Sequence, residues 1–187
     1  METIEGIRLI SASMMLTLLD DPHRASYEFR CHLESTGGDT ARYWTYHLPS
    51  EAADVTELRA WDEAGELQAC GLPGPDRTSR LNVRLRDPLC RRERYAFGFA
   101  FESSVQPVIA PSPRRPIITV ADSVVYSLPC AVLDVTVVLP SGAALVASVP
   151  GFPEAQAGRF TYRLRALRPR ETASFLVAYR RAAPRRP

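Results

Sequence analysis

Strict alternation of apolar and polar residues is the feature of this sequence that most constrains its fold. Residues 80–86 read R-L-N-V-R-L-R, and residues 95–101 read Y-A-F-G-F-A-F. Successive side chains of a β-strand point to opposite faces of the sheet, so each run buries one row of side chains and exposes the other. The same alternation occurs at residues 27–33, 160–165 and 175–179, while segments with the period of a helix are nearly absent. The sequence therefore predicts an all-β protein.

Turn-forming residues divide these runs into antiparallel strands. Asp20-Asp21-Pro22-His23 predicts a turn, because Asp starts turns and Pro fixes φ. Residues 7–19 fit a strand or a short helix, and we favour a hairpin of residues 8–19 with residues 26–35. The D-E-A-G sequence at residues 62–65 predicts a second hairpin loop, and the prolines and glycines of residues 71–76 predict a longer loop. Antiparallel sheets bury their apolar faces against each other, so the pattern predicts one or two antiparallel β-sandwiches, Ig-like or accessory-sandwich-like.

The second half of the sequence repeats the pattern of the first. Residues 81–101, LNVRLRDPLCRRERYAFGFAF, align with residues 160–179, FTYRLRALRPRETASFLVAY. The alignment matches Arg84-Leu85-Arg86 with Arg163-Leu164-Arg165, and past a small difference in the loop it pairs Leu89 with Leu167, Glu93 with Glu171, Phe97 with Phe175 and Phe101 with Tyr179. We interpret this as a tandem duplication of one β unit, each copy ending in a hairpin of an arginine-faced strand and an aromatic strand. Chance similarity of two β hairpins is the alternative.

Each copy also contains a strand that ends at Leu-Pro-Ser, at residues 48–50 and at residues 139–141. This order of a strand, Leu-Pro and a hairpin resembles the accessory β-sandwich domains that flank peptidase or transglutaminase-like catalytic domains. The resemblance covers the pattern of strands and not a motif, so it assigns no site residue.

Composition divides the chain into four segments. Residues 1–104 predict a β-sandwich domain or first repeat, and residues 117–181 predict a second, smaller β unit. Residues 105–116 hold four prolines, which exclude a central strand and predict a semi-rigid, extended connector. Residues 182–187 form a basic tail. The second unit has about 65 residues, near the lower limit for an independent core, so we expect it to pack against the first.

Charge is distributed unevenly along the chain. All 23 basic residues are arginine, which indicates a GC-rich coding genome that we take as bacterial, and the net charge of +2 is too small to imply nucleic-acid binding. Residues 1–104 carry 12 arginines and 17 acids, a net of −5, whereas residues 105–187 carry 11 arginines and 4 acids, a net of +7. Such asymmetry can let the halves attract, steer a partner or support head-to-tail association. Two solvated surfaces of different composition are the alternative.

The cysteines and the N-terminus indicate a reducing compartment. Cys31, Cys70, Cys90 and Cys130 include no C-x-x-C pair, so we expect free thiols and neither a metal nor a cofactor. The first residues, METIEGIRLISASMM, do not resemble a secretory signal, and no run of 18 apolar residues exists to span a membrane. If Met1 is the true start, the protein is expected to be cytoplasmic.

Candidate catalytic groups are few, and we assign no catalytic residue. The histidines are His23, His32 and His47, and pairing His47 with Ser50 would need a nucleophile elbow or similar motif that the sequence lacks. The acids Asp62, Glu63 and Glu66 cluster in the predicted hairpin loop but lack the spacing of a calcium loop. Surface or core histidines and ordinary turn acids explain both sets.

The residues that we expect to bind a partner are the repeated arginines and the small face of one strand. They are Arg84, Arg86, Arg163 and Arg165, with Ala96, Gly98 and Ala100. Arginine suits protein contacts because its guanidinium is planar and weakly hydrated, and small side chains leave room for another chain. We therefore expect a non-enzymatic adaptor or accessory subunit that acts on another protein or on itself. The alternatives are a small-molecule cavity lined by the aromatic rows, with or without catalytic activity, and weak nucleic-acid binding by the basic second half.

Overall fold

The computed structural model describes residues 7–37, 41–47, 54–73, 79–112, 115–125, 128–156 and 158–181. These residues form fifteen strands and no helix, which confirms the predicted all-β class. The strands are β1 (Ile7–Leu18), β2 (Arg24–Ser35), β3 (Ala41–His47), β4 (Thr56–Asp62), β5 (Gly65–Leu67), β6 (Ala69–Pro73), β7 (Ser79–Leu89), β8 (Arg94–Ser104), β9 (Val108–Ala110), β10 (Ile117–Val125), β11 (Cys130–Val138), β12 (Ala144–Val149), β13 (Glu154–Gln156), β14 (Arg159–Leu167) and β15 (Thr172–Arg180).

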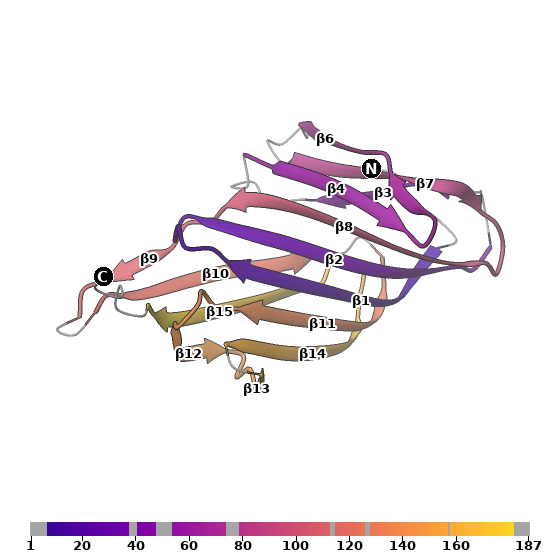
Figure 1. Ribbon diagram of the computed structural model, residues 1–187. Coiled ribbons are helices and arrows are strands. Elements are labelled where there is room, and N and C mark those ends of the chain that lie inside the picture. The colour runs from indigo at the N-terminus through magenta and orange to yellow at the C-terminus, as the bar shows by residue number, and fades with distance from the viewer. Residues whose placement is uncertain are drawn as a thin grey trace.

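One long sheet runs through the molecule and joins its two halves. Its strand order is β13-β14-β11-β1-β2-β8-β4-β5, and the neighbours pair antiparallel except for β1 and β11, which run parallel. Figure 1 shows β8, β2, β1 and β11 lying side by side across the molecule. Because β11 belongs to the second half of the sequence, backbone hydrogen bonds connect the two halves directly.

Two smaller sheets cover one face of the long sheet and enclose the core. The sheet β3-β7-β6 lies over the first half, where Phe29 stacks on Phe99 at 4.7 Å and Trp44 meets Phe97 edge-on. The sheet β12-β15-β10-β9 lies over the second half, where Phe152 contacts both Phe175 of β15 and Tyr162 of β14. Burial of these apolar rows between layers supplies the main driving force for folding.

The two halves have the same strand order. In the first half the layers are β2-β8-β4 and β3-β7-β6; in the second they are β10-β15-β12 and β11-β14-β13. Taken in chain order, each strand of the second set occupies the place of its counterpart in the first. This correspondence agrees with the aligned sequences, and tandem duplication is our interpretation of it.

The aligned turns have the same geometry. Glu93 accepts a hydrogen bond from the backbone N–H of Cys90 at 2.7 Å, and Glu171 accepts one from Arg168 at 2.8 Å. In both turns the residue before the glutamate has a left-handed backbone, with φ of 65° at Arg92 and 64° at Arg170. Each turn is therefore closed by its own glutamate.

The expected hairpins of arginine-faced and aromatic strands are wrong in one respect. β7 and β8 follow each other across a tight turn, yet β7 pairs with β3 and β6 while β8 pairs with β2 and β4. β14 and β15 are likewise in different sheets. Both strands of each pair have one buried row of side chains. Two such rows pack best when they face each other across the core between two sheets. Alternation reports which face of a strand is buried but not which strand it pairs with.

Three further segments differ from the sequence expectation. Residues 71–73 belong to β6 and pair with β7, where a short edge strand tolerates the terminal proline. Within the proline-rich segment 105–116, β9 forms a three-residue edge strand against β10. β13, which was not expected, pairs with β14. Residues 48–50, 74–76 and 182–187 lie outside the described residues.

Candidate functional site

The open face of the long sheet, on the side away from the smaller sheets, carries two of the four predicted arginines. Arg163 donates two hydrogen bonds to Asp134 on the adjacent strand, at 2.6 and 2.8 Å, and Arg165 is exposed beside it. The Arg163 guanidinium holds the pKa of Asp134 below its ordinary value. Much of this face is occupied by such cross-strand ion pairs, which is typical of a solvated surface.

The other two arginines lie on the three-stranded sheet. Arg84 is exposed on β7, and Arg86, at the end of the same strand, donates to both carboxylate oxygens of Asp62 at 3.0 and 2.9 Å. The four arginines therefore do not form one surface. They occupy equivalent strands of the two halves, and those strands belong to different sheets.

Asp62 is the centre of a small polar cluster. Besides its two bonds from Arg86, it accepts a 2.6 Å hydrogen bond from the hydroxyl of Tyr95 and one from the backbone of Ala64. The Arg86 hydrogen bonds, helped by Tyr95, lower the pKa of Asp62 well below its usual range. Partial burial, together with the hydrogen bond to Asp62, raises the pKa of Tyr95 to about 12. The cluster fixes the β4–β5 hairpin against the end of β7.

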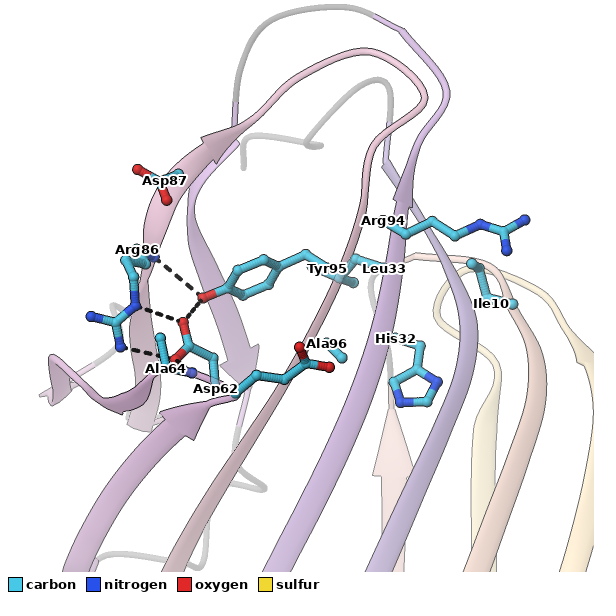
Figure 2. A pocket seen from close by; sticks show the side chains of 11 residues that line it. Ile10, His32, Leu33, Asp62, Ala64, Arg86, Asp87, Arg94, Tyr95 and Ala96 are labelled. Atoms are coloured by element: carbon cyan, nitrogen blue, oxygen red, sulfur yellow. Dashed lines mark hydrogen bonds and ion pairs between the residues drawn. The ribbon is translucent and has the colours of Figure 1, made fainter.

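An open cavity of about 600 Å³ lies beside this cluster, as Figure 2 shows. Asp62, Arg86 and Tyr95 line one side of it, and His32 and Ile10 line the other. The cavity has polar groups at its rim and can admit a small polar molecule.

A serine–histidine contact in this region was missed by sequence reasoning. The hydroxyl of Ser11 lies 3.1 Å from Nδ1 of His32 on the neighbouring strand. Both positions face outward in the alternation, but only the register of β1 against β2, with its bulge before Ser11, brings them together. His23 is exposed in the β1–β2 turn, and the side chain of His47 and residue 50 are outside the described part of the structure.

The chain's own Trp61 covers part of the row of small side chains on β8. A Cβ atom at Gly98 would lie 2.5 Å from the Trp61 indole, so Trp61 rests directly on this glycine. Ala100 is 4% exposed, and Ala96 is partly exposed at the edge of the cavity. Ala96, Gly98 and Ala100 do share the open face with Arg163 and Arg165, but Trp61 fills the space that Gly98 leaves.

A second surface, which the sequence did not single out, is uncharged except at one end, where Arg180 lies opposite Ala144 and Ile117. It is the outer face of the four-stranded sheet, and we call it the uncharged face. By register it comprises Val108 and Ala110 of β9, alternate residues from Ile117 to Val125 of β10, alternate residues from Ser174 to Ala178 of β15, and Ala144, Ala147 and Val149 of β12. Val108 is 68% exposed and Val149 is 65% exposed. These two are the most exposed large apolar side chains in the described part of the molecule.

The sequence contains a weak indication of this surface. Residues 144–149 read A-L-V-A-S-V and contain no charged residue, so this strand is apolar on both faces. A strand with two apolar faces is expected to be covered on both sides. The structure covers the inner face with the core and leaves the outer one open.

The remaining predictions concern thiols, metals and membranes. The four cysteines are free, with Cys31 and Cys130 buried and Cys70 and Cys90 exposed, and burial raises the pKa of the Cys31 thiol. Within the described ranges, His, Cys, Asp and Glu side chains form no group of three or more that could hold a metal. Those ranges also include no helix long and apolar enough to cross a membrane.

Comparison with known proteins shows a fold and not a family. No family model matches the sequence, and no curated protein matches it. Solved structures do match. Native yeast LTA4 hydrolase superposes with a TM-score of 0.61 at 8% sequence identity and covers 93% of this chain. Yeast LTA4 hydrolase in complex with bestatin superposes with a TM-score of 0.63 at 8% sequence identity and covers 92% of this chain. Native leukotriene A4 hydrolase from Saccharomyces cerevisiae gives 0.60 at 8% over 93%.

In each case the match covers 29% of the hydrolase chain. This chain therefore spans less than a third of the proteins that it resembles. At 8% identity the likeness shows a shared arrangement of strands, and it carries no information on activity.

Proposed function

We propose that this chain is a non-enzymatic accessory β-sandwich that works by binding another protein. The observation that carries the proposal is the uncharged face of the four-stranded sheet, with Val108 and Val149 about two-thirds exposed. Val108 and Val149 lie on the two edge strands of this sheet, with β10 and β15 between them. Exposed apolar side chains that share one face of a sheet can mark an interaction site. Burying one such valine fully is worth on the order of 1.5–3 kcal/mol, so a few of them provide a useful affinity.

The fold comparison supports the same proposal. In the yeast hydrolases this arrangement of strands is 29% of a longer chain, so there it borders a larger protein body. We propose that here a separate protein occupies the corresponding place. The four free thiols are those expected of a reducing compartment, and we place the complex in the cytoplasm.

Native mass spectrometry of the chain purified gently from its own host tests this function. The proposal expects a second protein at a fixed stoichiometry. A chain that carries only a small added mass would contradict it, and so would a chain that arrives bare at the concentrations of the cell.

The second candidate function is the binding of a small polar molecule, and the cavity beside Asp62 favours it. Its rim combines the guanidinium of Arg86, the phenol of Tyr95 and the imidazole of His32. A small added mass that is lost when Tyr95 is changed to Leu would support this candidate over the accessory role.

A further inference from the structure

We infer that the partner of the uncharged face has an apolar surface with carboxylates at its ends, and that it is not a second copy of this chain. This inference rests on the proposed function and specifies the chemistry of the partner.

Arginines stand at both ends of the uncharged face. Arg180 ends β15 and lies opposite Ala144 and Ile117 in register, and it is exposed. Arg115 is exposed just before β10, where it donates a 2.9 Å hydrogen bond to the backbone oxygen of Arg181. At the other end, Arg168 is exposed in the turn that precedes β15. Arginines therefore frame the neutral face, and at the Arg168 end the carboxylate of Glu171 lies in the same turn.

Three of the four acids of the second half have partners of their own, and the side chain of the fourth, Glu154, lies outside the described residues. That half has four acids against eleven arginines. Asp134 is bound to Arg163 on the open face of the long sheet, and Glu171 caps a backbone amide in its own turn. Asp122 points inward and accepts a hydrogen bond from Tyr27. The positive potential at the ends of the uncharged face is left for a partner to complement.

A second copy of the chain fits this surface badly. Two uncharged faces packed against each other about a two-fold axis would bring one arginine frame against the other, and like charges across an interface are costly. The acidic first half would satisfy the charges, but among its described residues Tyr43 is the one large apolar side chain that is exposed. It therefore lacks an apolar surface to match Val108 and Val149.

A zero-length cross-link tests the inference at the side chain of residue 180. The sequence has no lysine, so the variant Arg180→Lys carries one side-chain amine and keeps its charge. Carbodiimide joins an amine to a carboxylate only when the two are in contact. The complex isolated from the host is treated with carbodiimide, and the matched control is Arg165→Lys on the open face of the long sheet. We expect the position-180 variant, and not the position-165 variant, to form a covalent link to an acidic residue of the partner.

Three outcomes overturn the inference. A link through position 165 and none through position 180 would place the partner on the long sheet, with the accessory function intact. A link from position 180 to another copy of this chain would show self-association, as would a dimer in sedimentation of the pure protein at micromolar concentration. Absence of any partner from the wild-type preparation would reject the proposed function itself, which distinguishes the two failures.

Discussion

At Gly98 the backbone of β8 approaches the Trp61 indole so closely that no side chain fits between them. Arg59 also lies over the indole, with its guanidinium 5.8 Å from the ring centre. The alternation of residues 95–101 correctly predicts that Gly98 belongs to a row of small side chains. It cannot predict that Trp61 covers this row, because the register of β4 against β8 joins residues far apart in sequence.

The variant Gly98→Ala should be destabilised. Its Cβ would force the Trp61 ring to move, and overpacking of this kind costs about 1–3 kcal/mol. The matched control is Gly151→Ala, where a Cβ meets no atom within 4 Å, and its stability should change by less than about 0.5 kcal/mol. Urea denaturation measures both. Equal stability of the two variants would show that Trp61 does not rest on Gly98.

Asp62 should make the stability of the protein depend on acid pH. Its pKa in the folded state is lowered from an ordinary value near 3.8 by its bonds from Arg86 and Tyr95. Its contribution is therefore complete above that ordinary value and is lost as the pH falls toward the lower folded value. The variant Asp62→Asn should be less stable than wild type at neutral pH, with the difference shrinking below about pH 4. A difference that stays constant down to pH 2.5 would contradict this assignment.

At the scale of elements, the strands were predictable and their partners were not. Alternation locates β2, β7, β8, β14 and β15, since each has one buried row, whereas for β1 the sequence also fits a short helix. Pairing depends on which rows meet across the core, so β7 and β8 separate into two sheets although a tight turn joins them. The short strands β9 and β13 are too brief to show alternation at all. Arg84 and Arg86 lie on a different sheet from Arg163 and Arg165 for the same reason.

The two aligned turns should be equally sensitive to loss of their glutamates. Glu93→Ala and Glu171→Ala each remove a side chain that accepts a hydrogen bond from a backbone amide, which costs about 0.5–1.5 kcal/mol. The variant Glu63→Ala in the exposed β4–β5 turn is the control and should cost less than about 0.5 kcal/mol. Thermal unfolding compares the three. A large loss of stability for one variant and none for the other would mean that the two turns are alike in geometry but not in their contribution to stability.

At the scale of the whole molecule, the junction between the halves is both a sheet and a buried contact. β1 joins the halves by pairing with β2 on one side and β11 on the other. On the core side, Tyr27 stacks on Phe101 at 4.9 Å and donates a 2.8 Å hydrogen bond to Asp122 of β10. Burial raises the pKa of Asp122, because a charged carboxylate is poorly solvated between the layers. The sequence does not predict the contact between Tyr27 and Asp122, since it depends on how the four-stranded sheet packs against the long sheet.

The variant Asp122→Asn should gain stability relative to wild type as the pH rises. Because the folded pKa of Asp122 is raised, the wild type loses stability between the ordinary value near 3.8 and the higher folded value. Asn keeps a group that can bond with Tyr27 and cannot ionise. Urea denaturation from pH 3.5 to 8 measures the difference between the two proteins. An advantage that shrinks as the pH rises would show that Asp122 is stabilised as a carboxylate.

The central claim is that the uncharged face of the four-stranded sheet binds another protein. Native mass spectrometry of material from the host, comparing Val149→Glu with Val132→Glu, tests it most directly. Val132 lies beside Arg165 on the open face of the long sheet and serves as the matched control. The account predicts that the partner is lost from Val149→Glu and kept by wild type and Val132→Glu, with all three chains folded. A partner that stays on Val149→Glu and leaves Val132→Glu would contradict it.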